Sequence, residues 1–216
     1  MNPNRGGATG EAARRRSPPT AKATPPAPRL ATPRGYAYPW YVRLILALQR
    51  RKYGAELESA RLWGRMPLAF LTLTLFYRTL DRAGLPIEPG LRALVQVRIS
   101  QVNWCAFCVD LNGAAALERA VPAEKLATLE QYETSPLFSE REKAALAYAG
   151  ALTDAARRVD DACFARLRAH FGEQAVLELT ALAAFQNLSS KFNAALGVPA
   201  QGFCERTGSA VARGSA

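Results

Sequence analysis

Apolar residues recur every three or four positions along most of the chain after residue 35, a spacing typical of amphipathic helices. The pattern is clearest in residues 36–52 and 91–102, where one face of each helix would be apolar. Residues 173–196 carry charge only at Glu173, Glu178 and Lys191, so we expect a central helix that is buried nearly all round. No alternating strand pattern stands out, and the predicted fold class is all-α.

Glycine, proline and capping residues divide these helices. Gly54 and Gly64 interrupt the apolar pattern, and Pro67 suits the first turn of a long apolar helix. Ser139 and Glu142 have the spacing of a capping box, in which each side chain bonds the backbone amide of the other residue. Further helices are expected over residues 105–120, from 122 to about 135, and over 160–171.

Residues 1–34 differ from the rest of the chain in composition. They are rich in proline, and seven basic residues against one acidic residue give them +6 of the chain's formal charge of +10. Such a segment has too little apolar surface to offset the entropy lost on folding, so we expect a disordered tail. Residues 35–205 would then form one helical domain, followed by a flexible tail at 206–216.

The basic cluster Arg14-Arg15-Arg16 in this tail has two functional interpretations. It fails as a twin-arginine export signal, because no apolar stretch of the required length follows it. It could contact the phosphates of a nucleic acid, but we favour a solvated extension and expect no nucleic-acid partner.

No segment has the length of a membrane span. The longest uncharged apolar stretch, residues 66–77, has twelve residues, whereas a spanning helix needs roughly 20. The sequence also has no secretory signal pattern and only four cysteines. We therefore expect a cytoplasmic protein without a membrane segment.

Cys105 and Cys108 form a Cys-x-x-Cys pair at the expected start of a helix. On one helical turn the two sulfurs can come within disulfide distance, and the positive end of the helix dipole stabilises a thiolate. An inert buried pair and half of a zinc site have the same spacing. Because Cys163, His170 and Cys204 supply no second ligand pair, we expect neither a metal nor a cofactor.

The sequence around this pair resembles a known family. Residues 91–112, LRALVQVRISQVNWCAFCVDLN, resemble the carboxymuconolactone decarboxylase family and, more narrowly, its alkylhydroperoxidase D branch. Residues 139–148 and 185–193 are similar to that branch as well, so that the resemblance spans about residues 36–204. It implies an alkylhydroperoxidase D-like helical bundle assembled as a homotrimer or hexamer, and thiol-dependent reduction of peroxides.

The resemblance also implies a mechanism and its partners. Cys108 would attack a peroxide and become a sulfenic acid, Cys105 would condense with it, and an external dithiol would reduce the resulting disulfide. The family's proton relay is absent, however, because Ala93 and Asn112 stand where the active branch carries a glutamate and a histidine. Asn112 can hydrogen-bond a sulfur but cannot take its proton, so activity is expected to be low at neutral pH.

Two further residues near the pair are candidates for supporting it. Trp104 replaces a small residue beside the first cysteine and is expected to narrow access to the sulfurs. Arg98 could stabilise a thiolate, although we favour an ion pair with Asp110, Glu118 or a partner subunit. His170 is expected at a helix end, away from the pair.

Three functions therefore remain open. The first is a thiol-dependent peroxidase or disulfide oxidoreductase with a weakly activated Cys105–Cys108 pair. The second is a non-catalytic helical oligomer that has lost the redox chemistry, as the missing relay would suggest. The third is a lactone decarboxylase, which does not depend on a cysteine pair and is the least compatible with a site region that contains no histidine.

Overall fold

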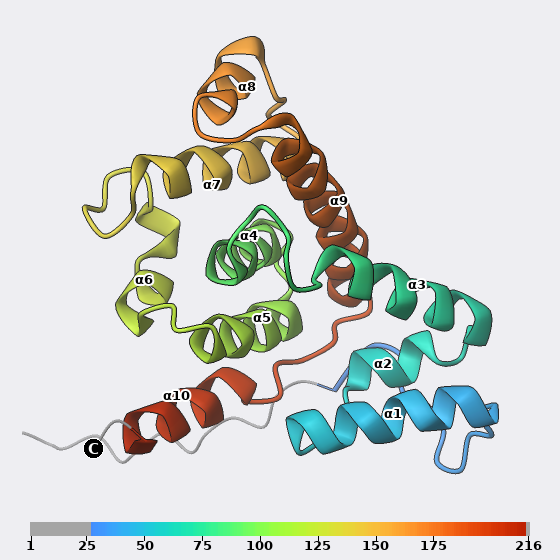
Figure 1. Ribbon diagram of the computed structural model, residues 1–216. Coiled ribbons are helices and arrows are strands. Elements are labelled where there is room, and N and C mark those ends of the chain that lie inside the picture. Colours follow the sequence, from blue (N-terminus) through green and yellow to red (C-terminus); the bar gives the residue numbers. More distant parts are fainter. Residues whose placement is uncertain (1–26, 215–216) are drawn as a thin grey trace, which may run out of the picture.

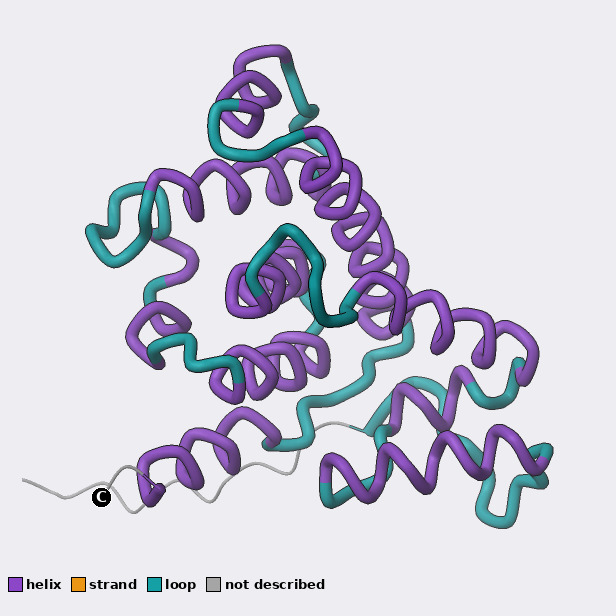
Figure 2. The backbone as a smooth tube through the Cα atoms, viewed as in Figure 1, coloured by secondary structure: helices purple, strands orange, loops and turns teal. Residues whose placement is uncertain are grey.

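The computed structural model describes residues 27–214, and this part of the chain is helical without any strand (Figures 1 and 2). None of its helices is both long and apolar enough to cross a membrane. In chain order the elements are α1 (Trp40–Tyr53), α2 (Glu58–Trp63), α3 (Pro67–Leu80), α4 (Pro89–Val102), α5 (Ala106–Glu118), α6 (Ala123–Ala127), the short 3₁₀ helix η1 (Leu129–Gln131), α7 (Glu140–Thr153), α8 (Asp161–Arg168), α9 (Glu173–Ala195) and α10 (Phe203–Gly214).

Helix α4 lies at the centre, with α5, α7 and α9 packed around it (Figure 1). Most of its side chains are buried, polar Arg92, Gln96 and Ser100 among them. The expectation of a central buried helix over residues 173–196 is therefore wrong. That helix, α9, buries one face against the bundle and exposes Leu177 and Leu188 on the other.

Two hydrophobic cores flank α4. The larger core joins α4 to α7, α8 and the first half of α9, and includes Leu94, Leu146 and Leu179. The second core lies between the N-terminal helices α1–α3 and the helices α5 and α10. It contains both cysteines of the Cys-x-x-Cys pair, packed with residues such as Val42, Leu62 and Phe203.

Several helix ends lie where the sequence predicts them. Pro67 occupies the first turn of α3. The Ser139 hydroxyl accepts the Glu142 backbone amide, and the Glu142 carboxylate accepts that of Ser139, so the predicted capping box is confirmed. Helix α2 was not predicted, because its six residues are too few to show a helical period. Burial of Ser59, Ala60 and Leu62 stabilises this short helix.

A helix, α10, covers residues 206–214 of the expected flexible tail. Helix α10 continues to Gly214 and packs along α5. The Asp110 carboxylate on α5 accepts the backbone amides of Gln201 at 2.7 Å and Cys204 at 2.8 Å, which anchors the start of α10. These contacts join residues far apart in sequence, so local composition does not reveal them.

At the other end of the chain, most of the expected disordered tail lies outside the described residues. Residues 27–34 are described and contact the domain. The Arg29 backbone amide donates to the Leu196 carbonyl at 2.8 Å, and the Arg29 guanidinium donates to the Ala195 carbonyl at 2.9 Å.

The capping box predicts a measurable contribution to stability. Replacing Ser139 by alanine removes the acceptor for an otherwise unpaired amide in the first turn of α7, so we expect the free energy of unfolding to fall by about 0.5–2 kcal/mol. Urea unfolding followed by circular dichroism measures it. Ser209→Ala, at an exposed position inside α10, is the control and should change stability by less than about 0.5 kcal/mol. Equal stability of the Ser139→Ala variant and the wild type would contradict the prediction.

Candidate active site

A tight turn between α4 and α5 positions the cysteine pair. Trp104 adopts a left-handed backbone conformation with φ 55°, and the Cys105 amide donates back to the Ser100 carbonyl at 3.0 Å. Cys105 is then the N-cap of α5, and its sulfur accepts the backbone amide of Cys108 at 3.2 Å. A disulfide joins Cys105 to Cys108, whose Cα atoms are 5.2 Å apart.

Both sulfurs lie inside the protein. Cys105 is 1% exposed and Cys108 is 3% exposed, because the second core covers them. Trp104, by contrast, is 90% exposed, so its ring lies in solvent while the core side chains cover the sulfurs. A surface hollow of about 700 Å³ lies elsewhere, at the N-terminal ends of α4 and α7, and its lining includes neither cysteine.

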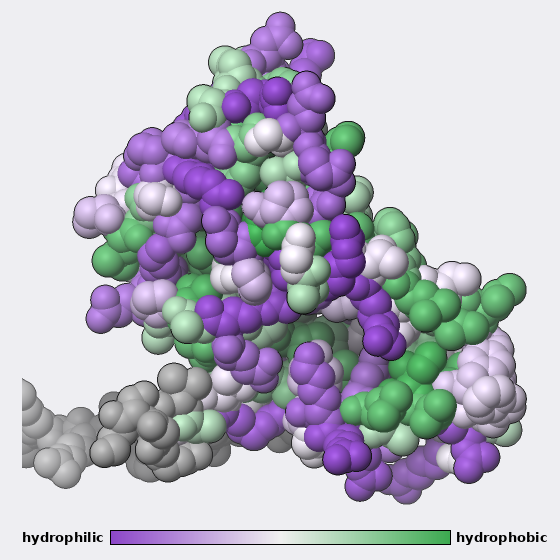
Figure 3. All heavy atoms as spheres, viewed as in Figure 1, coloured by the Kyte–Doolittle hydropathy of each residue, from purple (hydrophilic) through white to green (hydrophobic). Residues whose placement is uncertain are grey.

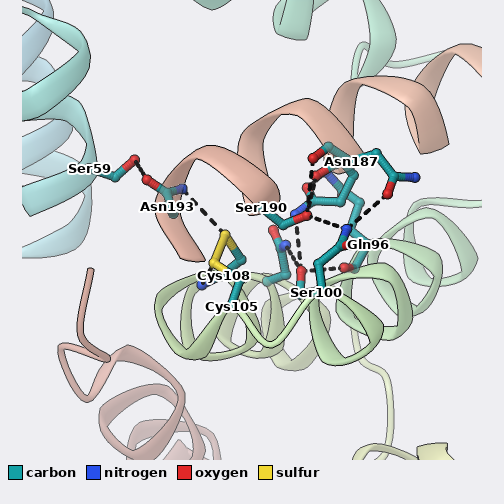
Figure 4. Close-up of a disulfide and its surroundings, with 11 residues drawn as sticks. Ser59, Gln96, Ser100, Cys105, Cys108, Asn187, Ser190 and Asn193 are labelled. Carbon is teal, nitrogen blue, oxygen red and sulfur yellow. Dashed lines mark hydrogen bonds between the residues drawn. A yellow bond between two sulfur atoms is a disulfide. The ribbon is translucent and has the colours of Figure 1, made fainter. Parts of the chain in front are cut away.

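Asn193 of α9 forms a side-chain hydrogen bond with Cys108. Its amide nitrogen donates to the Cys108 sulfur at 3.4 Å, and its amide oxygen accepts the Ser59 hydroxyl of α2 at 2.6 Å (Figure 4). All three residues are buried. Ser59 was not identified from the sequence; its only signal is a polar residue next to apolar ones in a segment without a clear period.

A second group of buried polar side chains meets at Ser100 of α4. The Ser100 hydroxyl accepts the amides of Asn112 at 3.2 Å and Gln186 at 3.0 Å, and donates to the Gln96 carbonyl at 2.6 Å. Asn112 was expected to bond a sulfur, but the structure places its amide on Ser100. All donors and acceptors at this hydroxyl are used by neutral groups, so it offers no base to a thiol.

Further amide contacts join α9 to the α4–α5 turn. Asn103 donates to Asn187 and to Ser190 at 2.8 Å each, and Asn187 donates to Thr153 of α7 at 3.0 Å. From the sequence, residues 185–193 showed only a similarity to the alkylhydroperoxidase D branch. In the structure they supply much of the polar surroundings of the pair. Ala93 is fully buried on α4, where the related branch carries a glutamate.

The Arg98 guanidinium contacts Gln101 and Tyr132. It donates to Gln101 at 3.5 Å and lies 5.7 Å from the centre of the Tyr132 ring. Within residues 27–214 it forms neither of the expected ion pairs, because Asp110 is engaged by the start of α10 and Glu118 is exposed near the end of α5.

The remaining candidates form no hydrogen bond with the pair among the described residues. His170 is exposed directly after α8. Cys163 and Cys204 are half-buried free thiols, and burial, together with a neighbouring aspartate, raises the pKa of each. Among the described residues, no group of three or more histidine, cysteine, aspartate or glutamate side chains is placed to hold a metal ion.

The polar network extends from Gln96 to a charged cluster. The Gln96 amide lies 3.4 Å from both the Tyr77 hydroxyl and the Gln186 side-chain oxygen. Tyr77 in turn donates to Asp81 at 3.2 Å, and Asp81 pairs with Arg92 and Arg119. Burial, followed by the charge of Asp81, raises the pKa of Tyr77 to about 12.

This raised pKa makes stability depend on alkaline pH. Because the pKa of Tyr77 is above its unfolded value near 10, its neutral form stabilises the folded protein below pH 10. That contribution is lost as the pH rises from about 10 to about 12. We expect Tyr77→Phe to flatten this alkaline decline, measured by urea unfolding at several pH values. Tyr132→Phe, whose parent tyrosine has a less strongly raised pKa, should flatten it less. If the stability of Tyr77→Phe falls with pH in parallel with that of the wild type, Tyr77 is not the source of the alkaline decline.

Comparison with known proteins agrees with this fold. The carboxymuconolactone decarboxylase family model matches residues 69–151. The uncharacterized protein YnjA of Escherichia coli (strain K12) is 45% identical over 157 residues, which cover 73% of this chain and 86% of YnjA. The uncharacterized protein YdfG of Bacillus subtilis (strain 168) is 29% identical over 107 residues, 49% of this chain and 73% of YdfG.

Two solved structures share the fold at low sequence identity. One is a peroxidase-related protein from Ralstonia eutropha JMP134 with an alkylhydroperoxidase AhpD core, at TM-score 0.72 and 24% identity, covering 83% of this chain and 95% of that one. The other is the debrominase Bmp8, at TM-score 0.71 and 20% identity, covering 84% and 96%. With the extent of the YnjA match, these findings show that the chain belongs to the carboxymuconolactone decarboxylase family and has an alkylhydroperoxidase D-like fold.

Proposed function

We propose that this chain is a thiol-dependent peroxidase or disulfide oxidoreductase that acts through Cys105 and Cys108. The observation that carries the proposal is the disulfide between these residues at the N-terminus of α5. At this position the unpaired amides and the helix dipole favour a thiolate, and the spacing lets a disulfide form and break without moving the helix. We place this activity in the cytoplasm, where reducing thiols are present.

The proposed cycle begins with the reduced pair. The Cys108 thiolate attacks one oxygen of a peroxide, the O–O bond breaks, and the other oxygen leaves as an alcohol or water after taking a proton. Cys108 is then a sulfenic acid. The Cys105 thiolate attacks its sulfur, the disulfide forms, and the sulfenic oxygen leaves as water after protonation. An external dithiol reduces the disulfide by two thiol exchanges and is itself oxidised.

One observation favours a second candidate, a helical module without redox activity. Ala93 and Asn112 supply no base, and the polar groups around Ser100 are neutral and already paired. A lactone decarboxylase is less well supported, because the described part of the chain places no histidine near the buried polar groups. Measuring the redox state of the pair separates the first two candidates.

A thiol count after peroxide treatment tests the proposed function. The fully reduced chain has four cysteines. After mild hydrogen peroxide, unfolding and alkylation, we expect intact mass to show that two alkylatable thiols have been lost and that dithiothreitol restores them. Trp104 emission should rise on reduction, because the adjacent disulfide quenches it.

Matched cysteine variants make this test specific. The Cys105→Ser variant should accumulate a sulfenic acid on Cys108, seen as the mass of one added oxygen, because the resolving thiol is absent. The double variant Cys105→Ser/Cys108→Ser should keep both remaining thiols, Cys163 and Cys204. If the wild type keeps all its thiols after peroxide, the non-catalytic module is the correct interpretation.

Exposed apolar side chains support a proposed trimeric or hexameric assembly. Only Phe70 of the apolar helix α3 is buried, whereas Leu68 is 70% and Leu75 is 54% exposed. Exposed Trp40, Leu44 and Leu48 follow one side of α1. Hydrophobic side chains gather over α1–α3 on the face shown in Figure 3. Contiguous apolar surface of this kind is typical of interfaces between subunits.

Light scattering tests this assembly. The wild type at micromolar concentration is expected to have the mass of a trimer or a larger oligomer, and Leu68→Glu/Leu75→Glu to lower it by placing charges in the interface. Phe164→Glu, at an exposed position of α8 remote from α3 in Figure 1, is the control and should leave the mass unchanged. A monomeric wild type would rule out the proposed assembly.

A further inference from the structure

We infer that Asn193, oriented by Ser59, is the positioning residue that stabilises the thiolate of Cys108 and so makes it the nucleophile of the pair. This inference rests on the proposed thiol chemistry and assigns a group that replaces part of the missing relay. It concerns two residues on helices other than α5, and therefore depends on how α2 and α9 pack against the pair.

In the structure the nitrogen of the Asn193 amide, and not its oxygen, faces the sulfur. Asn193 is 1% exposed, so its side chain cannot exchange partners with solvent. Its oxygen accepts the Ser59 hydroxyl at 2.6 Å, and its nitrogen then faces the Cys108 sulfur at 3.4 Å (Figure 4). A flipped amide would place a carbonyl oxygen against the sulfur and repel a thiolate. In this arrangement the Ser59 hydroxyl donates to the amide oxygen, which leaves the amide nitrogen to donate a proton to the sulfur.

The two sulfurs depend on different donors. Cys105 accepts the backbone amide of Cys108, which no side-chain substitution removes. Cys108 accepts the side-chain amide of Asn193. Burial penalises a thiolate, and a hydrogen bond that donates to its charged form offsets this penalty. Only the donor to Cys108 is a side chain. Substitution at position 193 should therefore change the pKa of the Cys108 thiol without changing that of Cys105.

The charged groups on the surrounding elements are engaged elsewhere. Glu58 of α2 pairs with Arg61 at 3.2 Å. Asp110 of α5 binds the two amides at the start of α10, and Lys191 of α9 is exposed. Arg98 of α4 donates to Gln101. With these groups engaged by other partners, the uncharged Asn193 amide is the side-chain donor to Cys108, and the positive end of the α5 dipole also favours its thiolate.

The test follows the pH dependence of alkylation in the reduced full-length protein. Iodoacetamide is applied across about pH 6–10, and peptide mass spectrometry measures the rate at each cysteine; the rate follows the thiolate. The midpoint is the pH at which the alkylation rate of a cysteine reaches half of its plateau. In Asn193→Ala we expect the midpoint for Cys108 to rise by about one to two pH units. Asn193→Asp keeps the size of the side chain but places a carboxylate at the sulfur, and should raise the midpoint further. Ser59→Ala should raise it less, because the amide remains but loses its orientation.

Asn187→Ala is the matched control. Asn187 is an amide of the same helix that bonds Thr153 and Asn103 rather than a sulfur, so its removal should leave the Cys108 midpoint where it is. In all these variants the midpoint for Cys105 should stay within a few tenths of a pH unit of the wild type, because its backbone donor is intact.

Three results would overturn the inference. The first is an unchanged Cys108 midpoint in Asn193→Ala and Asn193→Asp. The second is an equal shift of the midpoints of Cys105 and Cys108. The third is a faster plateau rate without a change of midpoint, because that result indicates loosened packing alone. Alkylation needs no peroxide, so this test is independent of the proposed function. If the protein shows the expected midpoints but keeps all four thiols after peroxide, it does not reduce peroxide. The role of Asn193 would still hold in that case.

Discussion

The reversal of the chain between α4 and α5 is the constraint on which the site depends. The amides of Asn103, Trp104 and Cys105 each donate to carbonyls in the last turns of α4, and Trp104 takes a left-handed backbone conformation that bulky residues rarely adopt. This geometry makes Cys105 the N-cap of α5 and places Cys108 one turn later. The close packing of α4 on α5 holds the turn in place, so the stability of the two helices supports the strained residue between them.

Polar side chains in the bundle then determine what the pair can do. Gln96, Ser100, Asn112 and Gln186 satisfy one another without a charge, which keeps a buried network stable at neutral pH. The same neutrality leaves no group to take a thiol proton. Within residues 27–214, α9 brings an uncharged group, the Asn193 amide, to the Cys108 sulfur.

Local signals predicted the elements that local interactions stabilise. The Ser139–Glu142 capping box and Pro67 at the start of α3 act within one helical turn, and both are confirmed. Helix α2 was missed, and most of α10 falls in the tail expected from residue 206, because both helices are held by contacts with distant segments. The burial of α9 was overestimated, since its apolar surface faces solvent on one side in the single chain.

The sequence by itself determined the all-helical class, the family and the position of Cys105 and Cys108 at a helix N-terminus. These follow from periodicity and from motifs whose residues are close together in the chain. Only the tertiary structure decided that Asn112 bonds Ser100 and that Arg98 donates to Gln101. It also brought Asn193 and Ser59, 134 positions apart, to within 2.6 Å of each other. Hydrogen bonds between distant helices depend on how those helices pack, and a single sequence records no such distances.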